Sequence, residues 1–135
     1  MTIPSNEQIV REFFGAMGPT LEDFKRNYRE RLSEDVVWES VGLPAHHGKD
    51  ACIAYLDDLH GRTGMEYCTI EVLHMASDND VVLSERLDTM CRADGTPIMT
   101  FRLMGAIQLR DGLIARYTDY FDTLSVASMT SSGTD

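Results

Sequence analysis

The sequence lacks the features that mark nucleic-acid-binding, secreted and membrane proteins. It has 12 lysines and arginines against 22 aspartates and glutamates, which gives a net charge of −10. A surface of that sign repels nucleic acid and anionic lipid, so we expect neither as a partner. The segment from Met1 to Asn6 has no basic start and no apolar run, and therefore predicts no signal peptide. No apolar stretch is long enough to cross a bilayer.

The sequence also lacks a disulfide or zinc framework. Cys52, Cys68 and Cys91 are odd in number and widely spaced, without a C-x-x-C pair. We expect them to be small core residues in a reducing compartment, which makes a cytoplasmic location the default. The adjacent pair His46-His47 has no carboxylate or cysteine at ligand spacing nearby, so we predict no metal site.

Composition indicates one domain, residues 1–135, with a substantial core. The chain has 135 residues, of which 43% are hydrophobic and 25% charged, as in ordinary globular domains. Apolar residues at helical spacing predict helices over Asn6–Met17 and from Thr20 to about Arg31, with a third after a turn at His47–Asp50 and ending near Gly61.

Period-two patterns dominate the second half of the chain. After a short strand at Val36–Val41, four strands are predicted, over Met65–Met75, Val81–Arg92, Pro97–Leu109 and Leu113–Phe121. Turn-forming residues separate them at Ser77–Asp80, Ala93–Thr96 and Arg110–Gly112. Helices followed by a meander indicate an α+β fold, in which a curved sheet and helices on its concave side enclose a pocket. The Ser/Thr-rich segment 125–135 is expected to be a mobile tail.

Two segments of this meander carry the candidate chemistry. Side chains alternate along a strand, so Arg86 and Asp88 share one face, and Asp119 shares a face with Tyr117 and Phe121. The meander places these strands two positions apart, close enough for an arginine to reach across. Two carboxylates beside one arginine can differ in proton affinity, so that one acts as base and the other as acid. A purely structural ion pair is the alternative.

These residues stand in motifs that resemble a known family. Glu85-Arg86-Leu87-Asp88 corresponds to an E-R-x-D motif, and Asp119-Tyr120-Phe121-Asp122 to a D-Y-F-D ending, with a matching strand-to-helix segment from Ser33 to Asp50. Together they resemble the limonene-1,2-epoxide hydrolase family, within the SnoaL-like and ketosteroid-isomerase-like domains, from about Glu7 to Asp122. The resemblance implies a cone-shaped, NTF2-like (cystatin-like) domain with a curved mixed sheet, three to four helices and an apolar pocket.

The resemblance also implies roles for single residues. Asp119 is expected to be the general base that deprotonates water, Asp88 the general acid that protonates the epoxide oxygen, and Arg86 the residue that holds both. The reaction would need no cofactor, metal or covalent intermediate. It would convert a small, mostly apolar epoxide into a vicinal diol, and a homodimer is expected. Trp38 and Ser40 stand where the family holds the water with tyrosine and asparagine, so the expected water- or substrate-binding site is altered.

Two other functions remain open from the sequence. One is a SnoaL-like cyclase or isomerase, in which Asp119 or Asp88 acts as a base on a carbon acid or polyketide intermediate. The other is a non-catalytic module for small-ligand binding or dimerisation on the same scaffold. Three charged side chains facing inward favour the hydrolase, whereas Trp38 and Ser40 favour the alternatives.

Overall fold

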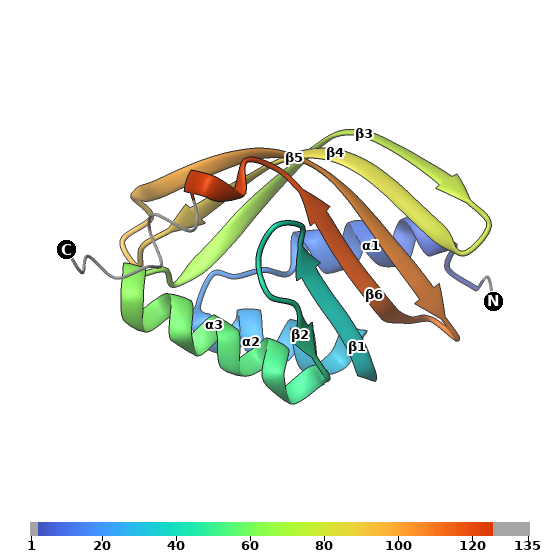
Figure 1. Ribbon diagram of the computed structural model, residues 1–135, viewed down its shortest axis with the longest axis horizontal. Coiled ribbons are helices and arrows are strands. Elements are labelled where there is room, and N and C mark those ends of the chain that lie inside the picture. The colour runs from blue at the N-terminus through green and yellow to red at the C-terminus, as the bar shows by residue number, and fades with distance from the viewer. Residues whose placement is uncertain (1–2, 126–135) are drawn as a thin grey trace.

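Helices lie against the concave side of one strongly curved β-sheet (Figure 1). The computed structural model describes residues 3–125, and within them three helices are α1 (Asn6–Gly15), α2 (Leu21–Arg31) and α3 (Lys49–Thr63). A further helical turn starts at residues 123–125. The strands are β1 (Leu32–Ser40), β2 (His46–His47), β3 (Tyr67–Asp78), β4 (Val81–Cys91), β5 (Pro97–Arg110) and β6 (Leu113–Tyr120).

The sheet is mixed, and its strand order sets the site. The order is β2-β1-β6-β5-β4-β3, with β1 and β6 parallel and every other neighbouring pair antiparallel. Strands β3 to β6 form the predicted meander, so β4 lies two places from β6 with β5 between them. The α+β architecture with a curved mixed sheet is confirmed.

Local sequence explains how the first two helices begin. Ser5 caps α1 by accepting a hydrogen bond from the Gln8 backbone, and the Gln8 side chain accepts one from the Ser5 backbone in return. Thr20 caps α2 in a similar way through the backbone of Asp23. Both helices turn their apolar residues toward the sheet, and the buried ones include Ile9, Val10, Phe13, Phe14, Phe24 and Tyr28.

Tight hairpins hold the long strands in register. Asn79 and Asp111 both have φ of 55°, and Gly112 follows at 80°. Such left-handed residues in two-residue turns match the twist of the flanking strands. These turns therefore set the register at one end of the β3–β4 and β5–β6 pairs.

Several boundaries differ from the sequence-based expectations. Helix α1 ends at Gly15 rather than Met17, and β3 runs on to Asp78, into the turn predicted from Ser77. Strand β1 starts at Leu32 instead of Val36, because α2 passes directly into it through an irregular register. Residues His46 and His47 form a short strand against β1, where a turn was predicted from His47; two residues are too few to show a period. Residues 126–135 of the expected tail lie outside the described residues.

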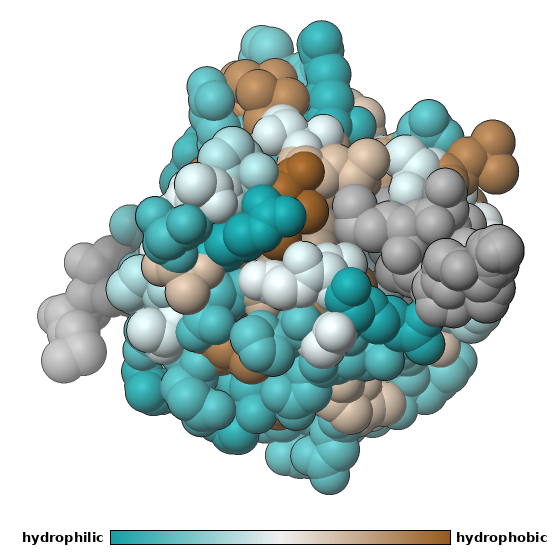
Figure 2. All heavy atoms as spheres, turned by 90° about the vertical axis from the view of Figure 1, so that its left-hand side faces the viewer, coloured by the Kyte–Doolittle hydropathy of each residue, from teal (hydrophilic) through white to brown (hydrophobic). Residues whose placement is uncertain are grey.

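None of the described helices has the length and apolar character needed to cross a bilayer. Figure 2 views the end of the molecule at which the β4–β5 hairpin lies. That face is largely hydrophilic, with hydrophobic residues confined to small groups, one of them near the centre of the view. The apolar residues are gathered instead between the sheet and the helices, where one charged side chain, Arg86, is among the largest that are fully buried.

Candidate active site

Arg86 connects the two carboxylates named from the sequence. Its side chain is 0% exposed, and it donates from Nε to Asp88 Oδ1 over 3.1 Å and from Nη2 to Asp88 Oδ2 over 2.9 Å. Nη2 also donates to Asp119 Oδ1 over 3.1 Å, across the width of β5. The predicted meeting of Arg86, Asp88 and Asp119 on one sheet face is therefore present.

Further contacts fix the guanidinium from its other sides. Nη1 of Arg86 donates to Ser84 Oγ over 3.3 Å on the same strand. The guanidinium carbon lies 4.4 Å from the centre of the Phe14 ring, which α1 places beneath it. Arg86 is thus held by β4, β6 and α1 together, which leaves it little freedom to move.

Gly105 provides the space through which Arg86 reaches Asp119. It lies on β5, opposite Ser84 on one side and Asp119 on the other. A Cβ atom at this position would lie 2.6 Å from Arg86 Nη1 and 2.6 Å from Asp119 Oδ1, closer than such atoms approach. Sequence reasoning missed this residue, although an isolated glycine inside a strand pattern is a signal of close approach.

Burial sets the electrostatics of the site. Asp119 is 5% exposed, and its pKa is raised from 3.8 to about 6. Burial is the largest cause; the charge of Arg86 acts in the opposite direction, and the charge of Asp88 adds to the rise. Burial lowers the pKa of Arg86, but Asp119 and Asp88 raise it, and the balance lies above its ordinary value. Arg86 therefore stays cationic, while Asp119 changes its protonation near neutral pH.

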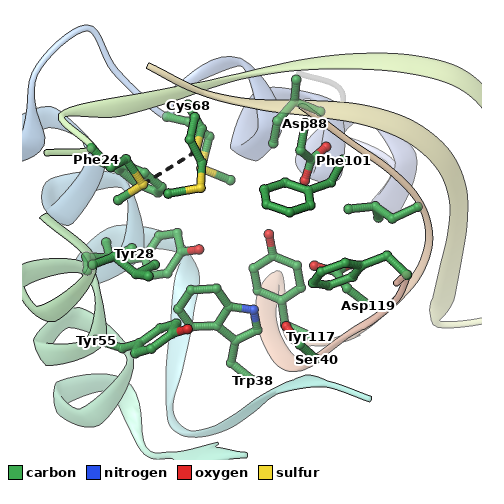
Figure 3. A pocket seen from close by; sticks show the side chains of 18 residues that line it. Phe24, Tyr28, Trp38, Ser40, Tyr55, Cys68, Asp88, Phe101, Tyr117 and Asp119 are labelled. Carbon is green, nitrogen blue, oxygen red and sulfur yellow. Dashed lines mark hydrogen bonds between the residues drawn. The ribbon is translucent and has the colours of Figure 1, made fainter. Parts of the chain in front are cut away.

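Both carboxylates line a half-open cavity of about 110 Å³. In Figure 3, Asp88, Asp119 and Ser40 lie on one side, and Phe24, Tyr28 and Tyr55 reach in from α2 and α3 on the other. Most of the remaining lining is apolar, from residues such as Met17, Leu56, Met65, Met90, Phe101 and Leu103. A small ligand in this cavity would be surrounded by largely apolar surface, with the charged groups confined to one side.

Trp38 and Ser40 line this cavity, as expected for neighbours of Asp119. In the parallel pair of β1 and β6, Trp38 lies beside Tyr117 and Ser40 beside Asp119. The indole stacks on the Tyr117 ring with centroids 5.5 Å apart and an interplanar angle of 13°. Its Nε1 atom is buried and has no hydrogen-bond partner. Trp38 and Ser40 thus both lie at the cavity, and the N–H group of Trp38 donates no hydrogen bond there.

Two aromatic side chains near the cavity, Tyr28 and Tyr55, were not singled out from the sequence, whereas His46 was considered there as a metal ligand. Tyr28 and Tyr55 each meet Trp38 edge-on, at 5.3 Å between ring centroids, and His46 stacks on Tyr55 at 4.0 Å. No pattern in the sequence predicts that these rings meet, because each comes from a different element and only packing unites them. Within residues 3–125, no three His, Cys, Asp or Glu side chains are grouped as metal ligands.

Solved structures with this fold include enzymes and proteins of unknown function. An M. tuberculosis LEH-like epoxide hydrolase matches with a TM-score of 0.70 at 21% identity, covering 96% of this chain and 89% of the other. A putative SnoaL-like polyketide cyclase from Jannaschia sp. CCS1 matches at 0.69 and 17%, covering 96% and 98%. An NTF2-like protein of unknown function from Burkholderia pseudomallei K96243 matches at 0.74 and 16%, covering 95% and 98%. At these identities the similarity shows the fold alone.

Sequence comparison is more specific. The chain is 31% identical over 91 residues to the epoxide hydrolase EphG of Mycobacterium tuberculosis (strain ATCC 25618 / H37Rv), a match covering 67% of this chain and 58% of the relative. The match thus spans 58% of the length of that curated relative. The limonene-1,2-epoxide hydrolase catalytic domain family matches residues 4–131. The chain belongs to the limonene-1,2-epoxide hydrolase catalytic domain family.

Proposed function

We propose that this protein is a cofactor-free epoxide hydrolase that adds water to a small, mostly apolar epoxide and releases a vicinal diol. The observation that supports this most is the pair Asp88 and Asp119, linked by the buried Arg86 at the edge of an apolar cavity. An apolar cavity with its charges on one side suits a hydrophobic substrate that reacts at a single polar centre.

The proposed reaction is one concerted step. Asp119 takes a proton from water as the water oxygen bonds to one epoxide carbon. The bond from that carbon to the epoxide oxygen breaks, and Asp88 gives its proton to this oxygen. Asp119 then releases a proton to solvent and Asp88 takes one up, so the cycle needs no other reactant. Ser40, next to Asp119 across the β1–β6 pair, would be the second partner of the water.

The raised pKa of Asp119 suits a general base. A carboxylate whose pKa is about 6 is ionised at neutral pH and is a stronger base than one at 3.8. We therefore expect kcat/KM to rise with pH, with a midpoint of about 6. A pH profile measured on the purified protein checks this, and a profile that is flat from pH 4 to 8 would contradict a base with this pKa.

One observation favours the reverse assignment of roles. Burial favours the proton on Asp119, whereas Arg86 directs two N–H groups at the oxygens of Asp88. The resting protein at acidic pH therefore holds a proton on Asp119, the residue that the proposed reaction needs ionised. Asp88 as base and Asp119 as acid is the second candidate mechanism, with the same substrate and product.

Azide distinguishes the two assignments, because it attacks an epoxide without first losing a proton. If Asp119 is the base, the Asp119→Asn variant should lose hydrolysis by at least about 100-fold but form azido alcohol when azide is added. The Asp88→Asn variant should also be inactive and should not be rescued. Rescue of Asp88→Asn alone would reverse the roles, and full hydrolysis by Asp119→Asn would reject the site. The exposed Asp122→Asn is the matched control and should behave as the unaltered protein.

The water site offers a further test of the hydrolase proposal. Trp38 has one N–H and no acceptor, so it cannot accept a hydrogen bond from water as tyrosine or asparagine can. A water held by fewer partners spends less time in a reactive geometry, which lowers turnover. The double variant Trp38→Tyr/Ser40→Asn should therefore raise kcat. An unchanged or lower kcat in a folded protein would mean that the cavity serves another reaction.

A SnoaL-like cyclase or isomerase is the alternative class, favoured by a buried carboxylate with a raised pKa among aromatic rings. Such an enzyme would exchange the α-protons of a ketone with deuterated solvent, and this exchange would depend on Asp119 or Asp88. A non-catalytic binding module would neither hydrolyse an epoxide nor exchange the α-protons of a ketone. The cytoplasmic location stays a prediction.

A further inference from the structure

A second cavity adjoins the first along a shared wall. It has a volume of about 210 Å³ and lies among β1, the loop after it, β2 and α3. Trp38, Ser40 and Tyr55 line both cavities. In Figure 3 the indole of Trp38 lies between the rings of Tyr55 and Tyr117, and its faces and edges are in contact with other rings. The wall between the cavities is thus made of side chains, not backbone.

Unused hydrogen-bonding groups are concentrated at this wall. Nε1 of Trp38 is the only buried side-chain nitrogen or oxygen without a partner in residues 3–125. The hydroxyls of Ser40 and Tyr55 and the ring nitrogens of His46 also form no hydrogen bond with any described residue. Leaving a buried donor unpaired is unfavourable, so such groups are normally satisfied. This penalty applies to the buried Nε1 of Trp38; Ser40, Tyr55 and His46 are half-buried and leave their polar atoms available to a ligand where the two cavities meet.

The charge of the second cavity limits what that ligand can be. Asp58 is paired with Arg62, whose Nε donates to both carboxylate oxygens over 3.1 and 3.0 Å. Burial lowers the pKa of His46, so its imidazole is neutral at physiological pH. The second cavity therefore presents hydrogen-bonding groups with no net charge. That suits a hydroxyl, ether or carbonyl oxygen better than a carboxylate or phosphate.

We propose that the two cavities are halves of one substrate site, which takes an epoxide carrying a neutral oxygenated arm. The epoxide end lies beside Asp88 and Asp119, and the arm passes Trp38 into the second cavity. An oxygen of the arm that lies against the edge of the indole would supply the hydrogen-bond partner that Nε1 lacks. Trp38, Tyr55 and His46 are then specificity-determining residues. The proposal rests on the hydrolase function for the identity of the reacting group, but not for the shape of the site.

Trp38 is the only tryptophan of the chain, so intrinsic fluorescence reports on the shared wall directly. The probes are octane-1,2-diol and heptane-1,2,7-triol, in which a hydroxyl replaces the terminal methyl group. In a wholly apolar site the triol should bind at least about tenfold more weakly, because its hydroxyl loses water without gaining a partner. We expect the triol to bind at least as tightly as the diol and to shift the emission of Trp38.

The variant Tyr55→Phe/His46→Phe keeps the stacked rings and removes their polar atoms. It should weaken triol binding about tenfold, the effect of losing a hydrogen-bonded partner, and leave diol binding unchanged. Tyr120→Phe, on the outer sheet face, is the matched control and should change neither. A triol that binds tenfold more weakly to the unaltered protein would overturn the proposal. The proposal would also be overturned if the double variant weakened the binding of the triol and the diol equally.

Kinetics separate this inference from the proposed function. The matched substrates are 6,7-epoxyheptan-1-ol and 1,2-epoxyoctane, and kcat/KM should favour the first in the unaltered protein but not in the double variant. If neither epoxide is opened while the triol preference persists, the hydrolase proposal fails and the two-part site stands. If both are opened equally and the titrations show no preference, the two-part site fails and the hydrolase stands.

Discussion

Strand β4 carries an ionic cluster on each of its faces, and the two clusters behave differently. On the inner face, Arg86 holds Asp88 and Asp119 at 2.9 and 3.1 Å. On the outer face, Glu85 is held by Arg102 at 2.8 Å and by His74 at 3.0 Å. The distances are similar, but the Arg86 side chain is 0% exposed, whereas those of Arg102 and His74 are 73% and 84% exposed.

Surroundings, rather than the type of interaction, separate the two clusters. The pKa of Glu85 is lowered, first by its hydrogen bond with Arg102 and then by that with His74, so it is simply ionised. The pKa of Asp119 is raised to about 6 despite a comparable arginine contact, because burial outweighs the attraction. An exposed ion pair contributes little to the free energy of unfolding or to chemistry. A buried ion pair can have shifted pKa values that suit catalysis, although its burial lowers the free energy of unfolding. The predictions below test that contrast.

The largest expected effect is the loss of the buried cation. Arg86→Met should reduce the free energy of unfolding by about 3–5 kcal/mol at pH 8, because it leaves two carboxylates without their partner. Arg102→Met, the matched change on the outer face, should cost less than about 1 kcal/mol. Urea denaturation of both variants measures the difference. Equal losses would show that burial does not distinguish the two clusters.

Removing the buried negative charge of Asp119 should instead raise the free energy of unfolding. The folded-state pKa of Asp119 lies above its ordinary value, so its ionisation destabilises the fold as pH rises from about 4 to about 6 and remains unfavourable above that. Asp119→Asn should therefore stabilise the protein at pH 8, by roughly 3 kcal/mol, and have little effect at pH 4. Glu85→Gln should instead lower stability slightly at pH 8. Thermal melting of both variants from pH 4 to pH 8 measures these changes. An Asp119→Asn variant that is less stable than the unaltered protein at pH 8 would contradict the prediction.

Filling the gap between Arg86 and Asp119 should have an intermediate effect. Gly105→Ala places a methyl group 2.6 Å from both side chains, which should cost about 1–3 kcal/mol and sharply lower kcat in any reaction that uses Asp119. Gly61→Ala, where nothing lies within 4 Å, is the control. It should be neutral or stabilising by up to about 1 kcal/mol, since alanine favours helix. Full activity of a folded Gly105→Ala would show that the contact is dispensable.

The smallest effect on the fold itself is expected at the apolar part of the outer face. Leu83, Met104 and Tyr120 are 42%, 52% and 54% exposed there, and we propose that they meet a second copy in a homodimer. Met104→Glu should convert the dimer to monomer in light scattering. It should change the unfolding free energy of the monomer by no more than about 0.5 kcal/mol. A purely monomeric unaltered protein at micromolar concentration would reject the dimer.

The sequence predicted most of the fold because local signals agreed with the final packing. Period-two strands, turn-forming residues and apolar residues at helical spacing required no knowledge of distant contacts. The misplaced elements, β2 and the start of β1, are those whose strand state depends on a neighbour. Two residues such as His46 and His47 become a strand only because β1 offers its edge.

Some features of the candidate site were likewise predictable from the sequence, whereas others depend on tertiary packing. Strand alternation and the order of the meander were enough to bring Arg86, Asp88 and Asp119 to one face, whereas Trp38 and Ser40 were assigned to the site by the family resemblance. The sequence by itself therefore determined which groups could meet. Only the tertiary structure decided what their meeting means, because desolvation, which raises the pKa of Asp119, depends on everything packed around it. The role of Gly105, the unpaired N–H of Trp38 and the second cavity likewise arise from close packing between elements, which no one-dimensional pattern records.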